Sequence, residues 1–198
     1  MGVRAVEPVP GHGQDWDDIV RIWEETDAPE GCKVEIIEEI VTVAPPPSDD
    51  HSATASPLQR PLCTVIPEGW GIYQTLGVAL PGRGGIRVPD LVVLPRAAAS
   101  GPGYHVPAAA ADARLVVEIT SRANADHDRV GKVNGYAKTG VELFLLLDPW
   151  HSGCPTATLY GEPGSGTYRV LETVEYGGKI SLREPFGLDL DTGVLPVS

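Results

Sequence analysis

The hydrophobic pattern is most informative between residues 115 and 148, where two apolar runs flank a polar stretch. Residues 115–121 are short, apolar and rich in β-branched side chains, which is typical of a buried strand. Residues 126–139 carry polar side chains at steps of four, which share one face of a helix. Gly140 follows where a left-handed helix cap is favoured. Because residues 143–148 are again apolar, the order predicts two parallel strands joined by a right-handed helical crossover.

Periodicity predicts further elements on both sides of this unit. Helical spacing predicts a helix over residues 16–25. A second helix is expected within 48–65, kinked at Pro57 or starting near it. Short apolar or alternating runs predict strands at residues 33–37, 40–43, 71–75, 78–80, 88–94, 156–160, 168–171 and 179–182. Residues 96–112 are rich in Ala, Gly and Pro and are expected to form an excursion, partly disordered or acting as a lid.

Charged residues interrupt two of the predicted strands. Glu118 lies inside the apolar run, where a carboxylate is costly unless a metal or a cation compensates for its lost hydration. Asp90 lies near the start of strand 88–94, and Lys132 lies on the helix that follows Glu118. Two carboxylates that bind Mg²⁺, with a lysine that stabilises negative charge, are what metal-assisted phosphodiester cleavage requires. Two alternative explanations involve no catalysis. Glu118 can form a buried ion pair with Lys132, and Asp90 can occupy a turn. Arg87 alternates with apolar neighbours and is expected to point away from the core.

Three segments carry the strongest motifs of the chain: P-D-L-V-V-L at 89–94, L-V-V-E-I-T-S at 115–121, and D-R-V-G-K-V-N-G-Y-A-K-T-G-V-E-L-F-L-L-L-D-P at 128–149. In this order and spacing they resemble the Uma-two family of restriction endonucleases, which is widespread in bacteria and belongs to the PD-(D/E)xK nuclease superfamily. The resemblance covers residues 16–149 well and the C-terminal tail loosely. It implies an α/β fold, with a restriction-endonuclease-like αβββαβ core whose mixed central sheet is flanked by helices. The alternating pattern after residue 149 adds a β-rich C-terminal extension.

The resemblance also implies roles for individual residues. Asp90 and Glu118 are expected to hold Mg²⁺ or Mn²⁺. The lysine that the superfamily places two residues after the glutamate is absent, because Thr120 stands there. The resemblance therefore implies that Lys132, on the following helix, takes over the stabilisation of the transition state.

Auxiliary residues follow from the same resemblance and from spacing. Glu35 matches a family glutamate and is expected to be an auxiliary ligand or to orient water, or else to be a solvated strand carboxylate. His51 matches a family histidine, either as a polar contact at the mouth of the pocket or as an ordinary exposed side chain. Tyr136, one turn after the lysine, is expected to pack in the core with its hydroxyl at the pocket edge. Asp148 matches a family acid, although a turn role beside Pro149 is the simpler interpretation.

Length and composition limit the classes of protein to consider. With 198 residues, we expect a flexible N-terminal arm over residues 1–14 and a single restriction-endonuclease-like domain over 15–198. No apolar run is long enough to span a bilayer, and the N-terminus lacks a signal-peptide pattern, so a membrane or secreted protein is not expected. Three widely separated cysteines suit a reducing cytoplasm better than a disulfide framework.

The formal net charge of −12 argues against tight binding to long duplex nucleic acid. A local basic strip on an acidic body can still contact phosphate, and the region of the predicted helix carries Arg122, Arg129, Lys132 and Lys138. The predicted function is therefore a Mg²⁺-dependent endonuclease that hydrolyses nucleic acid phosphodiester bonds, with DNA favoured over RNA. The alternative is a catalytically inactive nuclease-fold binding or assembly module. Homodimers are also expected, since family members commonly associate.

Overall fold

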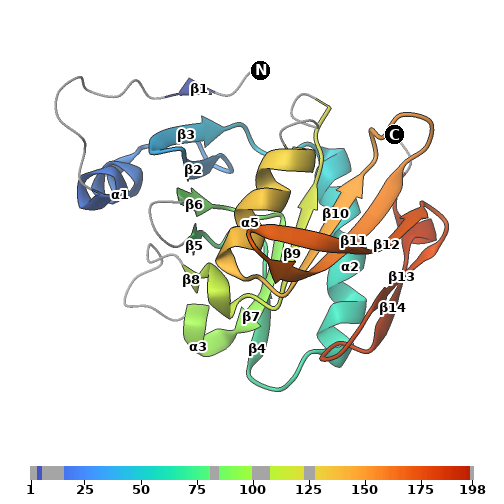
Figure 1. Cartoon of the computed structure of the whole chain (residues 1–198). Coiled ribbons are helices and arrows are strands. Elements are labelled where there is room, and N and C mark those ends of the chain that lie inside the picture. Colours follow the sequence, from blue (N-terminus) through green and yellow to red (C-terminus); the bar gives the residue numbers. More distant parts are fainter. Residues whose placement is uncertain (1–3, 6–15, 81–84, 100–107, 123–127, 197–198) are drawn as a thin grey trace.

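The computed structural model of the chain describes residues 4–5, 16–80, 85–99, 108–122 and 128–196 (Figure 1). The helical elements are α1 (Trp16–Glu25), α2 (Asp49–Val65), α3 (Arg96–Ala99), η1 (Ala110–Asp112), the π-helical turn η2 (Asp128–Lys132), α5 (Val133–Thr139) and η3 (Thr192–Val194). No helix among these described residues is long and apolar enough to cross a membrane.

The strands form two six-stranded sheets and a separate hairpin. The smaller sheet has the order β1-β3-β2-β6-β5-β8, the larger sheet has the order β12-β11-β10-β9-β7-β4, and β13 pairs with β14. The strands are β1 (Arg4–Ala5), β2 (Lys33–Ile37), β3 (Ile40–Ala44), β4 (Trp70–Tyr73), β5 (Val78–Leu80), β6 (Gly85–Arg87), β7 (Leu91–Pro95), β8 (Ala108–Ala109), β9 (Leu115–Ile119), β10 (Leu143–Asp148), β11 (Thr156–Gly164), β12 (Thr167–Glu175), β13 (Lys179–Leu182) and β14 (Leu188–Asp191).

The larger sheet is mixed and covered on both faces. Strands β9 and β10 are parallel and joined through η2 and α5, as the sequence predicted, while the other pairs are antiparallel. Figure 1 shows α2 and α5 on opposite sides of this sheet. Val117 belongs to the apolar cluster beneath α2 and Val116 to the cluster beneath α5. Because side chains alternate along a strand, Glu118 lies on the α5 side.

The smaller sheet presents an apolar face and a charged face. Ile36 of β2 pairs with Ile86 of β6, and both pack with Ile19 of α1. The next residues along this antiparallel ladder, Glu35 and Arg87, therefore face each other on the opposite side of the sheet. That side is turned towards the larger sheet, so charged residues lie where the two sheets meet.

The predicted elements are present with few differences. Helix α1 has the predicted bounds, and Gly140 ends α5 with a left-handed φ of 78°. Helix α2 is continuous from Asp49 to Val65 although Pro57 and Pro61 lie inside it, instead of starting near the first proline. The fold is the predicted α/β class with a mixed central sheet. The early strands, however, form a sheet of their own beside it.

Two predicted irregular regions are only partly described. Within residues 1–14, Arg4 and Ala5 pair with β3 as strand β1, and the rest of the expected flexible arm lies outside the described residues. The excursion 96–112 contains α3, β8 and η1. Its central part, 100–107, also lies outside the described residues.

Candidate active site

Asp90 lies where the two sheets meet, in the short segment between β6 and β7, and is only 6 % exposed. Its Oδ1 is 2.5 Å from Nζ of Lys33, at the start of β2. Its Oδ2 accepts a hydrogen bond from the backbone N–H of Ile119 at 2.8 Å and lies 2.8 Å from Nε2 of His51, in the first turn of α2. Three elements distant in sequence therefore converge on one carboxylate.

Glu118 lies in the middle of the larger sheet and is completely buried. Its Oε2 is 2.8 Å from Nζ of Lys132, the last residue of the π-helical turn. Its Oε1 accepts a hydrogen bond of 3.0 Å from the hydroxyl of Tyr136. Lysine and tyrosine thus occupy one helix face, as their four-residue spacing predicted.

The two carboxylates occupy neighbouring positions of the larger sheet. Strands β7 and β9 pair with Leu91 opposite Val117, so Asp90 and Glu118 follow at the next opposed position of the antiparallel ladder. The hydrogen bond from Ile119 N–H, one residue beyond Glu118, holds Asp90 at this place.

The surroundings shift the pKa values of Asp90 and Glu118 in opposite directions. Burial alone would raise the pKa of Asp90, but the hydrogen bond to His51 and the charge of Lys33 outweigh burial and hold its pKa below the usual range. Burial raises the pKa of Glu118 to about 7, because the opposing charge of Lys132 only partly compensates and the charge of Asp90 adds to the rise. Two neighbouring carboxyl groups whose pKa values are shifted in opposite directions therefore share one site. Groups with strongly shifted pKa values are common at functional sites.

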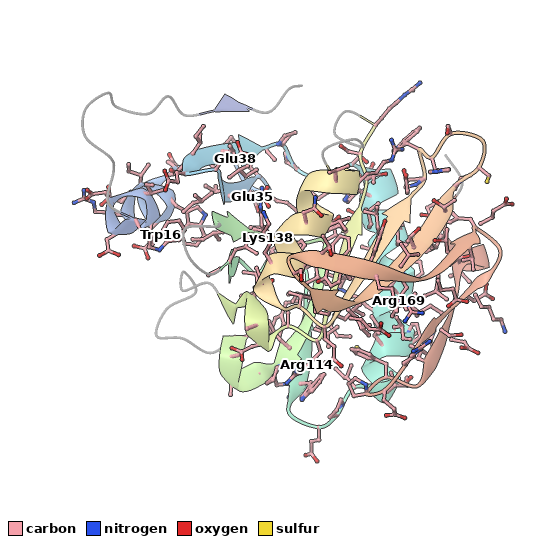
Figure 2. The ribbon with its side chains drawn as sticks, in the orientation of Figure 1. Trp16, Glu35, Glu38, Arg114, Lys138 and Arg169 are labelled. Carbon is pink, nitrogen blue, oxygen red and sulfur yellow. The ribbon has the colours of Figure 1, made fainter. Side chains whose placement is uncertain are left out.

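Glu35 is buried on the charged face of the smaller sheet, on the strand where Figure 2 labels it. Its Oε1 accepts a hydrogen bond of 2.8 Å from the backbone N–H of Val88. This bond ties β2 to the segment that leads into Asp90. The solvated carboxylate considered from the sequence is therefore not what the structure contains.

Arg87 differs from its prediction. Instead of pointing away from the core, its side chain is 8 % exposed, and its Nη1 is enclosed without a hydrogen-bond partner. Alternation with Ile86 placed Arg87 on the face opposite the apolar one, as expected. That face is covered by the rest of the molecule, which the alternation could not reveal.

A second polar network lies at the ends of β9 and β10. Arg129 of the π-helical turn donates to Asp148 from Nε at 2.8 Å and from Nη2 at 3.2 Å. Asp148 also accepts a hydrogen bond of 2.7 Å from Oγ1 of Thr120. Burial would raise the pKa of Asp148, but the bonds from Arg129 and Thr120 lower it. The same short turn thus attaches Arg129 to β10 and Lys132 to β9.

Two cavities adjoin the site. A small one of about 50 Å³ is lined by Lys33, His51 and Asp90, with Gln74 among its other walls. A larger one of about 520 Å³ shares Lys33 and is bounded by the end of α1 and the turn after it. The carboxylate Asp90 therefore borders a space that a ligand group can enter.

The donor set suits a hard divalent cation. Both carboxylates supply oxygen ligands, and Oδ1 of Asp90 and both carboxylate oxygens of Glu118 each retain a lone pair beyond their recorded hydrogen bonds. Among the described residues, no group of three or more His, Cys, Asp and Glu side chains could hold a metal. Asp90 and Glu118 are the two side chains that could hold Mg²⁺, which proteins bind through one or two carboxylates together with water and substrate phosphate.

The six candidates from the sequence, Asp90, Glu118, Lys132, Glu35, Tyr136 and His51, all lie where the two sheets meet. Sequence reasoning missed Lys33, the partner of Asp90. The two-residue spacing between Lys33 and Glu35 could have identified it, because this spacing puts both side chains on one face of the predicted strand.

Comparisons with known proteins agree with this architecture. The family model Uma2, described as "Putative restriction endonuclease", matches residues 16–197. A crystal structure from Anabaena variabilis, described as a "putative nuclease belonging to DUF820", is similar with a TM-score of 0.65 and 19 % sequence identity. The match covers 89 % of this chain and 96 % of that one. At this identity the likeness establishes a shared fold. No curated protein matches the chain.

Proposed function

Because this chain belongs to the Uma2 restriction endonuclease family, we propose that it hydrolyses phosphodiester bonds of DNA with the help of Mg²⁺ or Mn²⁺. The observation that carries the proposal is the pairing of two adjacent buried carboxylates, Asp90 and Glu118, each with its own lysine. Asp90 and Glu118 would hold the metal, which when bound supplies positive charge and acidifies a water molecule.

The chain's own residues account for the other requirements of the reaction. Lys132 lies beside Glu118 and can stabilise negative charge as it develops on the phosphate. Tyr136 fixes Oε1 of Glu118, and His51 fixes Oδ2 of Asp90, so both carboxylates are oriented before substrate binds. Lys33 adds a second positive charge at the side of the cavity.

Cleavage assays with Asp90→Asn and Glu118→Gln test this function. Purified protein with Mg²⁺ or Mn²⁺ should cut labelled DNA, and each variant should lose at least about a hundredfold in rate, because each loses a charged metal ligand. Calorimetric metal titration of the same proteins should show weakened binding in both variants. The proposal fails if the wild type binds metal normally and cuts neither single- nor double-stranded DNA or RNA.

The second candidate function is a nuclease-fold binding or assembly module without activity. The net charge of −12 and the hydrogen bonds already made by all four carboxylate oxygens favour it. In that case Glu118 serves to neutralise Lys132 inside the core, so Glu118→Gln should chiefly lower the melting temperature. A preserved melting temperature with lost cleavage supports the catalytic function instead.

Homodimerisation belongs to the same proposal. Strands β4 and β12 are the outer strands of the larger sheet, and an outer strand can pair with a second copy. Light scattering coupled to size-exclusion chromatography measures the mass directly and distinguishes a dimer from a monomer.

A further inference from the structure

The two cavities beside the carboxylate site share part of their walls. Asp90 and His51 line the small cavity, and the larger cavity reaches the end of α1 and the turn that follows it. Lys33, Pro47 and Thr75 line both. Because Nζ of Lys33 is bound to Asp90, the shared wall joins the larger cavity to a proposed metal ligand. A substrate with a phosphate at Asp90 therefore has room for a neighbouring group in the larger cavity.

The size of the larger cavity limits what this neighbouring group can be. Its volume is about 520 Å³, within the range of roughly 300–1,000 Å³ that is usual for sites of small organic ligands. A nucleic acid base belongs to this size class. It can enter such a space only when it is not stacked and paired inside a duplex. The cavity therefore suits a single strand better than a duplex.

The charge of the lining changes sign along the larger cavity. Among the described residues, Lys33 at the shared wall is the one cation of this lining. Glu24 at the end of α1, with Asp27 and Glu30 in the turn after it, lines the larger cavity and not the small one. These acids repel a phosphate, so the backbone of a strand does not follow the cavity to that end. Carboxylate oxygens do accept hydrogen bonds from the exocyclic amino group of a base.

An aromatic side chain forms another wall of the larger cavity. Trp23 of α1 lines it and is half-buried. Its Nε1 donates a hydrogen bond of 2.8 Å to the backbone carbonyl of Val34, which fixes the indole in place. Aromatic rings are common partners on which single-stranded bases stack. The cavity thus combines a cation at one end with an aromatic wall and hydrogen-bond acceptors.

We propose that the larger cavity binds the base of the nucleotide next to the phosphate at Asp90, so that the substrate is single-stranded DNA with a preference for a base such as cytosine at this subsite. The inference rests on the proposed hydrolysis of DNA and adds to it a substrate class and a base subsite. Cytosine offers its N4 amino group to the carboxylates. Thymine presents the acceptor O4 at the same position and is disfavoured there.

Binding without turnover tests the base subsite. The probes are a short fluorescein-labelled oligodeoxycytidine, an oligothymidine of the same length and a duplex of the same length, and their affinities are measured by fluorescence anisotropy in EDTA at pH 8. The wild type should bind the oligodeoxycytidine about tenfold more tightly than the oligothymidine, and the duplex more weakly than either. The ratio of the two single-strand affinities isolates the base contact, because attraction to the phosphates does not depend on sequence.

Replacing the acids tests which residues set this ratio. The combined variant Glu24→Gln, Asp27→Asn and Glu30→Gln should bring the ratio close to one, because an amide both donates and accepts hydrogen bonds and so accommodates either base. The loss of negative charge should strengthen the binding of both strands, but it should do so equally.

Three exposed acids that line neither cavity provide the matched control. The combined variant Glu68→Gln, Glu184→Gln and Asp189→Asn removes the same number of charges from other parts of the surface. It should keep the ratio of the wild type. An equal change of the ratio in both combined variants would assign the preference to net charge and overturn the base subsite.

Ala28, in the wall of the larger cavity, allows the space itself to be tested. Ala28→Phe fills part of the cavity and should weaken the binding of the oligodeoxycytidine about tenfold. Ala28→Ser keeps the space and should bind like the wild type. The melting temperatures of both variants show whether they fold.

The outcomes separate this inference from the proposed function. A wild-type ratio near one, duplex binding as tight as single-strand binding, or no binding of any probe overturns the base subsite, while the cleavage assay judges the catalytic proposal independently. A ratio that depends on the acids, in a protein that cleaves nothing, supports the subsite and overturns only the catalytic proposal. If Ala28→Phe does not fold, the ratio and its change in the first combined variant decide.

Discussion

Asp90 and Glu118 carry the same functional group, yet their surroundings shift the two pKa values in opposite directions. Asp90 is buried, but a lysine, a histidine and a backbone N–H stabilise its charged form. Glu118 is enclosed more completely, and Lys132 alone does not compensate for the loss of water. The difference arises from the partners of each residue, because both belong to the same sheet and face the same site.

Glu118 therefore predicts a pH dependence of stability. Its pKa is about 7 in the folded protein, above the 4.5 of an ordinary glutamate, so the folded state holds a proton that the unfolded chain releases. Stability from this group is fully present below about pH 4.5 and is lost as the pH rises through 7. Between these values the free energy of unfolding should fall by roughly 1 kcal/mol per pH unit.

Urea denaturation of wild type and Glu118→Gln at pH 5, 6, 7 and 8 measures this slope. The variant cannot titrate at this position, so the difference between the two proteins should shrink or change sign as the pH rises. The contribution of Asp90 has the opposite sign and is lost only at lower pH, as the pH falls through its depressed pKa. Parallel curves for the two proteins would contradict a raised pKa at Glu118.

At the scale of elements, the π-helical turn η2 positions the site lysine. Arg129 and Lys132 lie three residues apart in this turn and reach acids on two adjacent strands, Asp148 on β10 and Glu118 on β9. π-Helical turns inside α-helices are often found at functional sites. The Arg129–Asp148 pair therefore helps to hold the turn in the position that brings Lys132 to Glu118.

Asp148→Asn should weaken this attachment. The variant removes the charge that Arg129 pairs with, so the free energy of unfolding should fall by about 2 kcal/mol, as for other hydrogen bonds to charged groups. The cleavage rate should fall while metal affinity stays close to wild type, because neither proposed metal ligand changes. Asp189→Asn, at an exposed acid on β14, is the control for loss of one charge. An unchanged rate in Asp148→Asn would remove the positioning role.

The hairpin between β2 and β3 supplies another prediction for a single element. Ile37 pairs with Ile40, so Glu38 and Glu39 form a two-residue turn, and both have left-handed backbones with φ of 50° and 64°. A turn of this type favours Asn followed by Gly, because side chains crowd the backbone at positive φ. The turn is therefore a tight two-residue turn although neither of its central residues is glycine.

Combining Glu38→Asn with Glu39→Gly should raise the free energy of unfolding by about 1 kcal/mol, the lower end of the strain for such residues. Glu39→Ala is the control, since it shortens the side chain without the conformational freedom of glycine. Chemical denaturation of the three proteins measures the effect. Equal gains from the alanine and glycine variants would assign the change to the side chain of Glu39 and not to backbone strain.

At the scale of the whole molecule, the site exists because two sheets meet. The larger sheet brings Glu118 together with the helix-borne Lys132. The smaller sheet contributes Lys33, Glu35 and Arg87 from its charged face. Net charge acts at this scale too, since a chain of charge −12 can bind phosphate only where positive side chains are concentrated. At the junction of the sheets, Lys33, Lys132 and Arg87 are matched by the carboxylates of Asp90, Glu118 and Glu35.

The sequence by itself determined the crossover unit, because apolar runs and a polar helix set the faces of β9, α5 and β10 through local periodicity. It also determined that Lys132 and Tyr136 share one helix face, since four-residue spacing on a helix is a local property. The role of Lys132 beside Glu118 was implied by the family resemblance. Only the tertiary structure decided that Lys33 would pair with Asp90, that Arg87 would be enclosed, and that Arg129 would reach Asp148. Periodicity tells which face a side chain occupies, but what covers that face depends on contacts between segments far apart in the chain.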